Sequence, residues 1–266
     1  MKKIMFFTVL IGIAFILYAQ DVESIVRDSR NRIKAETVST RSRMVIQAKD
    51  GSTSERVFDQ YSKDGPNGKR IIIAFMRPET WRETRYMDIE NSGGSNNRYL
   101  FIPFRNDELD PSHLQADRTR RISSTLGIEE FAKTDFSYDD LVFENRNVSL
   151  DTHSLLREED LNGNICYVIQ SVPKDNSYQY SKMILWIAKD TLITMKIEMY
   201  NKRNILVKIA EMSSLKEVQG RLIATVIKMT TLPTNTSTII FKDTIRFNDP
   251  VPDGVFTPKY LETGRL

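Results

Sequence analysis

Arg98-Tyr-Leu-Phe-Ile-Pro-Phe104 opens the stretch around which the rest of the chain is organised. Its composition is that of a β-strand, and a polar loop with three clustered arginines follows it (Arg118, Arg120, Arg121). A short amphipathic segment, Leu126-Gly-Ile-Glu-Glu-Phe-Ala-Lys133, comes next, and Thr134-Asp-Phe-Ser-Tyr-Asp-Asp-Leu141 closes the stretch. We predict that the amphipathic segment is a short helix inserted between strands.

The insert needs a sheet to lie on, because the sequence on both sides of it is almost wholly strands and turns. A lone helical insert with aromatic residues must cover its apolar side against a face of that sheet. Ile128, Phe131 and Ala132 would share one helix face at spacings of three and four residues. Phe136 and Tyr138 alternate just beyond. The insert therefore either plugs the core or roofs a cavity that a ligand can enter.

The first residues have the features of an export signal. Met-Lys-Lys precedes an uncharged and mostly apolar run, residues 4–17, and Leu-Tyr-Ala ends at Ala19. We predict a signal peptide over residues 1–19, cleaved after Ala19, and a periplasmic protein. A membrane anchor is the alternative, although a transmembrane helix needs about 20 apolar residues. No cysteine follows the run, so we expect no lipid modification.

Charge and cysteine content exclude several classes of protein. The formal charge of +3 becomes +1 when Lys2 and Lys3 leave with the signal peptide. A near-neutral chain lacks the basic excess of a nucleic-acid binder. The single cysteine, Cys166, lies in an apolar run, which favours a buried and inert thiol and rules out an intramolecular disulfide. Stability must therefore come from the core.

The chain in order begins with a predicted helix from Asp21 to about Lys34. From Val38 the hydrophobic period changes to two, and Lys69–Met76 is apolar on both faces, as in a strand covered on both sides. Trp81–Glu90 is a further predicted strand. We count about eleven strands joined mostly by short turns, so the sheet should be antiparallel. Nothing divides residues 20–266, which we interpret as a single domain.

Two local signals fix details after the insert. Leu161-Asn-Gly-Asn164 predicts a hairpin, because Asn-Gly is the strongest short signal for one. The last segment, Pro250 to Leu261, is rich in proline and glycine, and Val255, Phe256 and Leu261 are its apolar anchors.

Catalytic and metal-binding patterns are missing from the sequence. It has no Gly-x-Ser-x-Gly elbow and no glycine-rich phosphate loop, and its two histidines and one cysteine have no close spacing. Acidic neighbours in sequence point apart on a strand and do not form a dyad. We therefore expect no enzyme, no cofactor and no metal.

The remaining signal is an excess of apolar strand surface over covering helix. Burial of apolar surface contributes about 25 cal/mol per Å². A half-covered sheet would therefore bind lipid strongly or aggregate. The alternative is a sheet that curls enough to fill its own core.

The order of several short motifs resembles the LolA-like family of outer-membrane lipoprotein-sorting proteins, in its larger bacterial branch. The matching pieces cover nearly the whole chain after the leader: Met44-Val-Ile-Gln47, Ile73-Ala-Phe-Met-Arg-Pro78, Tyr99-Leu-Phe-Ile-Pro103, Arg120-Arg-Ile122, residues 134–141, Val172-Pro-Lys174, Tyr180-Ser-Lys-Met-Ile-Leu-Trp-Ile187 and Pro252-Asp-Gly-Val-Phe-Thr257.

The resemblance implies a mainly β (α+β) fold, a single curved antiparallel sheet forming an incomplete β-barrel with short helices as a lid. It implies a carrier that binds acyl chains of lipoproteins or lipids in an apolar cavity. Its partners would be an inner-membrane transporter and an outer-membrane acceptor. In this family the arginine of an Arg-Pro pair tethers the lid, which suggests Arg77.

Taken together, pattern and resemblance give one candidate set. The expected cavity-lining residues are Met44, Ile46, Ile71, Ile73, Phe75, Trp81, Tyr86, Leu100, Ile102, Ile128, Phe131, Phe136, Tyr138, Leu185 and Ile197. The arginines of the polar loop, Arg118, Arg120 and Arg121, can contact lipid phosphates, or they can form a solvated cluster at a strand edge. The alternative function is a non-catalytic envelope scaffold or sensor, or an accessory to an inner-membrane lipid exporter.

Overall fold

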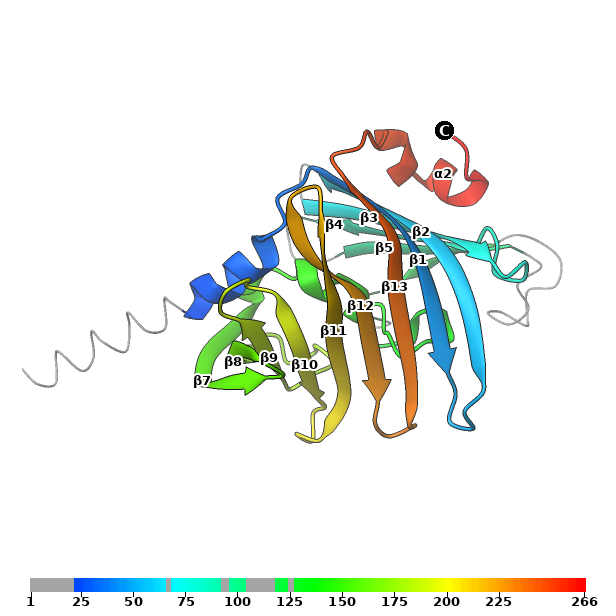
Figure 1. Ribbon diagram of the computed structural model, residues 1–266. Coiled ribbons are helices and arrows are strands. Elements are labelled where there is room, and N and C mark those ends of the chain that lie inside the picture. Colours follow the sequence, from blue (N-terminus) through cyan, green and yellow to red (C-terminus); the bar gives the residue numbers. More distant parts are fainter. Residues whose placement is uncertain (1–21, 66–67, 92–95, 104–117, 124–126) are drawn as a thin grey trace, which may run out of the picture. The chain divides into compact units, whose positions relative to one another are not determined.

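The computed structural model describes residues 22–65, 68–91, 96–103, 118–123 and 127–266. Over these residues, thirteen strands form one antiparallel sheet in the order β6-β5-β4-β3-β2-β1-β13-β12-β11-β10-β9-β8-β7 (Figure 1). The strands are β1 Thr37–Gln47, β2 Thr53–Gly65, β3 Gly68–Arg77, β4 Arg85–Glu90, β5 Asn96–Ile102, β6 Arg118–Ile122, β7 Asp151–Leu161, β8 Asn164–Pro173, β9 Lys182–Ala188, β10 Thr194–Tyr200, β11 Leu206–Val218, β12 Arg221–Thr231 and β13 Thr236–Phe247.

The predicted class, mainly β with an open antiparallel sheet, is confirmed, but the number of strands is wrong. The strand order does not close, because β6 and β7 stand at its two ends. The sequence count of about eleven strands missed β6, whose arginines were interpreted as part of a loop. Charged residues suit this position, because β6 is an edge strand.

The chain divides into two compact units. The first contains Met1–Ile33 and Arg146–Ile209, and the second contains Lys34–Asn145 and Ala210–Leu266. Strand β11 begins in the first unit and ends in the second. Each unit is described below by itself.

In the first unit, strands β7 to β10 carry a helix over residues 22–31. Val22 and Val26 are buried, and Ser29 Oγ lies 3.3 Å from Thr194 Oγ1 of β10. The helix ends earlier than the predicted Lys34, and its expected cap, Asp21, lies outside the described residues. Cys166 is buried and free, as its apolar surroundings predicted.

The turn between β7 and β8 confirms the predicted hairpin. Leu161 pairs with Asn164, and both intervening residues have positive φ, 54° for Asn162 and 86° for Gly163. Two central residues with positive φ define the turn whose twist matches that of the strands. Glycine at the second position accepts this conformation without a Cβ clash.

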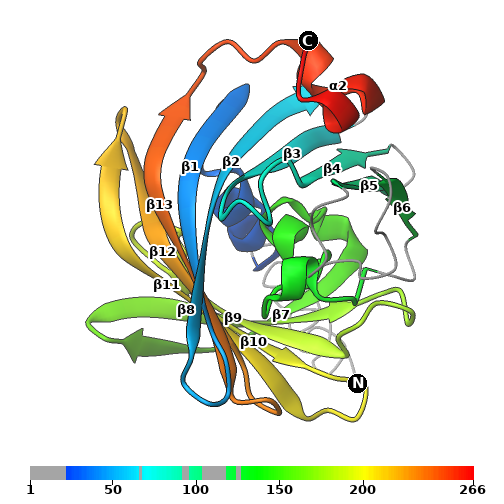
Figure 2. The same ribbon diagram turned by 90° about the vertical axis from the view of Figure 1, so that its right-hand side faces the viewer.

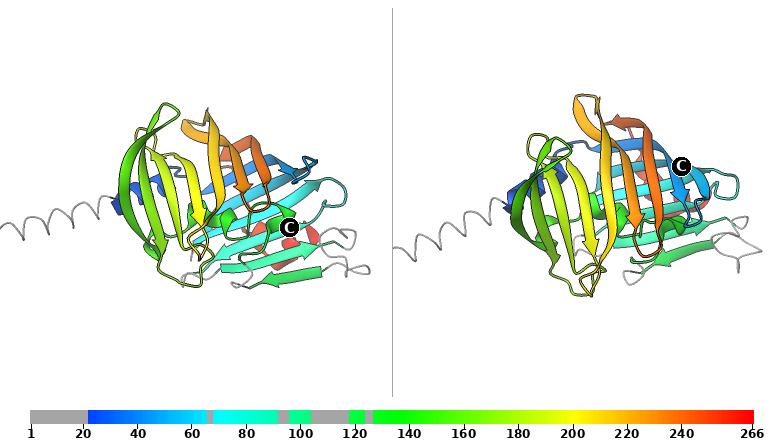
Figure 3. Two further views of the ribbon diagram at one scale, coloured as in Figure 1. Left: turned by 90° about the horizontal axis from the view of Figure 1, so that it is seen from below. Right: turned by 60° about the horizontal axis from the view of Figure 1, so that its bottom comes forward.

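In the second unit, β1 to β6 continue through β13 and β12. β1 pairs with β2 on one side and with β13 on the other, and β13 lies beside β1 in both views of Figure 3. On β3, Ile71, Ile73 and Phe75 point to one face and Ile72 to the other, and all four are buried. The predicted strand with two covered sides is therefore confirmed.

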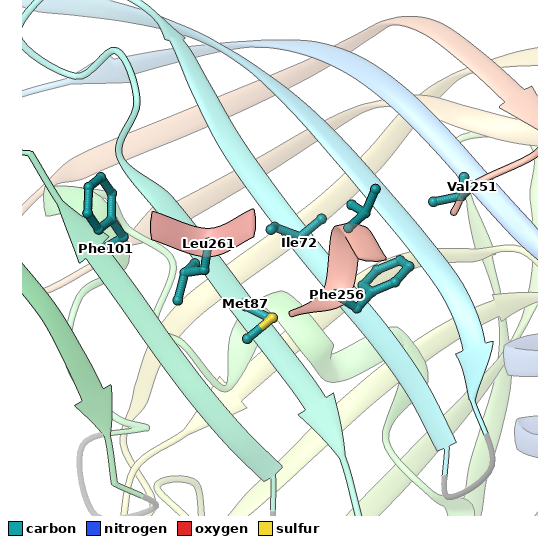
Figure 4. Close-up of a cluster of buried hydrophobic side chains, with 7 residues drawn as sticks. Ile72, Met87, Phe101, Val251, Phe256 and Leu261 are labelled. Atoms are coloured by element: carbon teal, nitrogen blue, oxygen red, sulfur yellow. The ribbon is translucent and has the colours of Figure 1, made fainter. Parts of the chain in front are cut away.

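One face of β3–β5 is covered by the segment of residues 249–263, called the tail here. It contains the short helices η5 (Asp253–Phe256) and α2 (Pro258–Thr263), which lie over β2–β4 in Figure 2. Val251, Val255, Phe256 and Leu261 of the tail pack with Ile72, Met87 and Phe101 of the strands (Figure 4). The predicted anchors Val255, Phe256 and Leu261 are all buried.

Two predicted elements differ from the structure. β4 begins at Arg85, and Trp81 lies in the turn before it, where its amide donates to Pro78 O over 3.0 Å. The predicted helix at 126–133 is absent from the described part of that range, where the only helical residues are the 3₁₀ turn η2 (Phe131–Lys133). Further 3₁₀ turns, η3 (Asp140–Asn145) and η4 (Val148–Leu150), follow.

Candidate functional site

The register of the second unit gathers the predicted apolar residues on one face. Directly paired residues of antiparallel strands share a face, and Phe58 pairs with Phe75, Ile73 with Tyr86, and Tyr86 with Leu100. Met44, paired with Arg56, belongs to the same face. The residues that the sequence predicted and this register brings together are Met44, Ile46, Ile71, Ile73, Phe75, Tyr86, Leu100 and Ile102.

This face is the one opposite the tail, and residues 127–140 lie on it. They form a compact hairpin and not a helix: Phe131 N donates to Phe136 O over 2.7 Å, and Tyr138 N donates to Glu129 O over 3.2 Å. We call this segment the insert hairpin and the sheet face below it the hairpin face.

Backbone conformation explains why the predicted helix fails. Ala132 (φ 51°, ψ 38°) and Lys133 (φ 53°) are left-handed, a conformation that ends a right-handed helix. The turn buries Phe131 and Ala132 but leaves Ile128 58% exposed. The prediction that Ile128 shares a helix face with Phe131 and Ala132 is therefore wrong.

Six aromatic rings join the insert hairpin to the sheet. The Phe131 ring centroid lies 5.9 Å from Phe75, 5.4 Å from Tyr86 and 5.7 Å from Tyr138. Phe75 also contacts Phe58 (5.9 Å) and Trp81 (5.3 Å). Phe131 is only 1% exposed, and Phe136 and Tyr138 are buried as well. Aromatic pairs at these separations contribute about 0.5–1.5 kcal/mol beyond the area that they bury.

The first attachment of the insert hairpin to the sheet is made by Arg56, and not by the predicted Arg77. Arg56 is buried on β2, its Nη1 donates to Ala132 O, and its Cζ lies 3.7 Å from the centroid of the Trp81 ring. Arg77 is the last residue of β3, and its side chain is exposed. The Arg-Pro pair does end the strand as predicted, but this position at the strand end leaves Arg77 in solvent.

A second attachment joins the hairpin to β13. Asp135 Oδ1 accepts from Thr236 Oγ1 over 2.5 Å, and its Oδ2 accepts from Thr238 Oγ1 over 2.6 Å. The Asp135 amide donates to Thr238 Oγ1 over 3.1 Å. Asp135 and Thr238 are buried, so these hydrogen bonds satisfy polar groups that would otherwise be costly.

A third attachment is ionic and involves β4 and β5. Arg98 Nε donates to Asp88 Oδ2 over 2.8 Å, and Arg98 Nη1 donates to Asp139 Oδ1 of the hairpin over 2.6 Å. Asp88 also accepts from Tyr86 (3.0 Å) and Asn96 (2.7 Å). Burial alone would lower the pKa of Arg98, but the Tyr86 hydroxyl and the two carboxylates outweigh it and raise that pKa. Burial raises the pKa of Asp88, against the opposing effect of Arg98.

Two of the predicted arginines, Arg120 and Arg121, lie on opposite faces of the sheet. β6 register puts Arg120 on the hairpin face, opposite Leu100, where its Nη2 lies 2.8 Å from Glu129 Oε2. Arg121 points to the other face and donates to Asn97 Oδ1 over 3.1 Å. Arg118 pairs through its backbone with Ile102. The alternation of the strand separates side chains that are neighbours in sequence.

Two predicted residues lie in the first unit. Leu185 of β9 and Ile197 of β10 are paired with each other and buried. They belong to the core of that unit.

Sequence reasoning missed Arg56, Asp88, Arg98, Asp135 and Asp139. A signal for two of them was present, because Asp88 alternates with Tyr86, and Arg98 with Leu100 and Ile102, in the apolar phase of their strands. A charged residue in the buried phase of a strand needs a partner. No comparable signal marked Arg56 or Asp135.

The described residues were compared with the requirements of a metal site and of a membrane-spanning helix. The described residues contain no group of three or more histidine, cysteine, aspartate or glutamate side chains placed to hold a metal ion. Across the same residues, none of the helices has both the length and the apolar character of a membrane span.

Comparison with known proteins finds a matching family model and solved structures with a similar fold. A family model with the description "uncharacterized protein" matches residues 67–263. The chain is similar to the solved structure of an outer membrane lipoprotein-sorting protein domain from Vibrio parahaemolyticus, with 21% identity and a TM-score of 0.81, over 91% of this chain and 99% of that one. No curated protein matches the chain in sequence.

Two further solved structures have the same fold. A DUF1329 family protein from Desulfovibrio piger is 23% identical, with a TM-score of 0.82, over 92% of this chain and 99% of that one. A LolA superfamily protein from Nitrosomonas europaea is 18% identical, with a TM-score of 0.69, over 90% and 98% of the two chains. Likeness at these identities establishes the fold.

Proposed function

We propose that this chain, which belongs to the LolA-like family, is a periplasmic carrier that binds acyl chains of lipoproteins or lipids and transfers them between the inner and outer membranes. The observation that carries the proposal is the hairpin face. A broad apolar and aromatic sheet face is covered by an irregular hairpin that a small number of polar contacts hold in place.

An acyl chain can replace the hairpin on this face. The side chains under the hairpin are aliphatic and aromatic, and each buried methylene of a ligand gains about 0.8 kcal/mol. Ligand entry requires the hairpin to leave, because Phe131 is 1% exposed when the hairpin is docked. The hairpin is then the lid of the carrier, and Arg56 is its tether.

The proposed domain organisation and membrane partners are those expected of a LolA-like carrier. We propose one domain over residues 20–266 that forms an incomplete barrel, with strand β11 common to both units. We also propose that Leu185 and Ile197, which are buried in the first unit, line the part of the ligand site that this unit provides. An inner-membrane transporter would load the carrier and an outer-membrane acceptor would unload it.

Export is a separate part of the proposal. Cleavage after Ala19 should give a mature protein that begins at Gln20 and carries no lipid. N-terminal sequencing of the protein from a periplasmic fraction tests this. An intact Met1 on membrane-bound protein would show that the segment is an anchor.

One observation favours the alternative of a scaffold or sensor. The hairpin face is already filled by the protein's own side chains, as a permanent plug would fill it. In that case the protein would act through its outer surfaces and would bind no ligand under the hairpin.

Ligand binding separates the two functions. Purified protein is delipidated and titrated with an environment-sensitive fluorescent fatty acid, and unlabelled lipid is then added. A carrier should bind the probe saturably and release it to the competitor. Absence of saturable binding after delipidation would leave the scaffold as the better description.

A further inference from the structure

The charged side chains under the hairpin are unevenly divided, because both arginines belong to the sheet and two of the three carboxylates belong to the hairpin. On the sheet side lie Arg98, Arg120 and Asp88, and on the hairpin side lie Asp139 and Glu129. Arg98 Nη1 is 2.6 Å from Asp139 Oδ1, and Arg120 Nη2 is 2.8 Å from Glu129 Oε2. Each of these two arginines therefore forms an ion pair with a carboxylate of the hairpin.

Undocking of the hairpin removes both of those carboxylates. The sheet is then left with two arginines and one carboxylate, Asp88, among the five charged side chains named above. Asp88 is already shared, because it also accepts hydrogen bonds from Tyr86 and Asn96. It is attached to Arg98 and has no contact with Arg120 among those that the structure describes.

The loss of Asp139 leaves Arg98 with one of its two carboxylates. The Arg98 side chain is 8% exposed, and it borders apolar and aromatic side chains. Water can solvate this arginine while the face is open, but an acyl chain that takes the place of the hairpin excludes that water again. A buried charge that has lost a partner is then costly. Within the described residues, Arg120 Nε is also buried without an acceptor. The open hairpin face thus attracts an anion next to an apolar surface.

We propose that the ligand of this face is an acyl lipid with an anionic, phosphate-type headgroup, whose oxygens replace Asp139 on Arg98 and Glu129 on Arg120. This inference rests on the proposed function and adds the chemical class of the ligand. Phosphate oxygens, like carboxylate oxygens, accept charge-assisted and often bidentate hydrogen bonds from guanidinium groups. Exchange of one acceptor for another keeps both arginines compensated in the closed and loaded states.

Calorimetric titration of the delipidated protein tests the headgroup directly. The probes are lysophosphatidylglycerol, which is anionic, and a neutral monoacylglycerol of equal chain length, both below their micelle concentrations. We expect the anionic probe to bind about tenfold more tightly, as one or two added charge-assisted hydrogen bonds predict. Inorganic phosphate alone should bind far more weakly than lysophosphatidylglycerol.

Two neighbouring residues of β6 provide a matched pair of variants. Arg120→Gln should reduce the preference for the anionic probe severalfold, and because Arg120 is 38% exposed, this variant should fold. Arg121→Gln removes the same charge from the opposite face and should leave the preference unchanged. Asp139→Asn, which weakens the competing hairpin contact, should instead tighten binding of the anionic probe.

The outcomes separate the inference from the function on which it rests. Equal binding of the two acyl probes overturns the headgroup inference and leaves the carrier intact. Inorganic phosphate that binds as tightly as lysophosphatidylglycerol also overturns it, since the site would then serve a free anion. If Arg121→Gln reduced the preference for the anionic probe as much as Arg120→Gln does, the proposed contact of the headgroup with Arg120 would be wrong. Binding of neither acyl probe overturns the carrier itself.

Discussion

The same three strands, β3 to β5, are covered on their two faces in different ways. The tail covers one face with four of the seven residues of a buried apolar cluster, supplemented by polar contacts such as the hydrogen bond from Arg85 Nη1 to Leu261 O over 3.0 Å. It ends in α2, a helix with Thr257 as its N-cap and Gly264 in the left-handed C-cap position. The insert hairpin covers the other face with stacked aromatic rings, left-handed residues and buried polar contacts.

Under the proposed function, the difference separates a permanent cover from an exchangeable one. Contacts between aliphatic side chains are non-directional, and nothing in water replaces them at equal free energy. The hairpin contacts instead pair a fixed donor with an acceptor, so another acceptor can take the same place. Substitutions at four positions test this contrast, from the largest expected effect to the smallest.

Phe256→Ala should damage the tail cover most. Phe256 is 5% exposed in the apolar cluster, and loss of a buried Phe side chain costs about 3–5 kcal/mol. The free energy of unfolding, measured with urea, should fall by this amount, and ligand binding should not change. Lys259→Ala, at an exposed position of α2, is the control. A loss below about 1 kcal/mol would mean that the tail is not part of the core.

Phe131→Ala tests the hairpin cover at a residue that is equally buried. We expect a loss clearly smaller than about 3–5 kcal/mol, because a hairpin that undocks before the sheet unfolds limits the loss to its own docking free energy. Ligand affinity should change at the same time. Phe131→Asp should keep the sheet folded and weaken binding of apolar probes. A full core-sized loss with unchanged binding would identify the hairpin as a plug.

Arg56→Lys isolates the tether. Lysine keeps the positive charge but loses the planar group that stacks on Trp81 and donates to Ala132 O. A desolvated cation–π contact contributes about 2 kcal/mol, so we expect a loss of about 1–2 kcal/mol in unfolding free energy. Hydrogen exchange at the amides of residues 131–138 should accelerate more than exchange in β3. The exposed Arg77→Lys should have no effect, and an equal effect would restore Arg77 as the tether.

Tyr138 gives the smallest effect and appears only at high pH. Burial raises the pKa of Tyr138 to about 12, above its ordinary value of 10.0. The folded state therefore prefers the neutral phenol, so its contribution is complete below pH 10 and is lost as the pH rises towards 12. By pH 11 we expect a loss of about 1 kcal/mol. The free energy of unfolding should fall by about 1 kcal/mol more between pH 8 and pH 11 in the natural protein than in Tyr138→Phe. An equal fall in the two proteins would contradict this prediction.

The features that the sequence predicted correctly depend on local patterns. The apolar residues on both faces of Ile71 to Phe75 indicated a strand with two covered faces. Asn162-Gly163 indicated a hairpin turn in which both central residues have positive φ. The anchors of the tail were visible as isolated apolar residues among proline and glycine. The ordered motifs indicated the family, and with it the fold.

The failures concern contacts between distant segments. Residues 126–133 have the charge order of a helix, but the hydrogen bond from Arg56 to Ala132 and the rings around Phe131 stabilise a tight turn there instead. Propensity is a weak prior when tertiary contacts compete with it. The ion pair of Asp88 with Arg98 depends on the register of β4 and β5, which composition does not specify.

The position of β13 and the tail in the chain has a consequence for biosynthesis. The tail follows all thirteen strands, and one of the three attachments of the insert hairpin uses Thr236 and Thr238 of β13, which bind Asp135. A chain that emerges from a ribosome or a translocation channel with its N-terminus first presents β3 to β5 without the tail and with an insert hairpin that lacks its attachment to β13. Their apolar residues then stay accessible until synthesis is nearly finished. The nascent chain should therefore depend on a holding chaperone, and truncation before residue 236 should yield insoluble material.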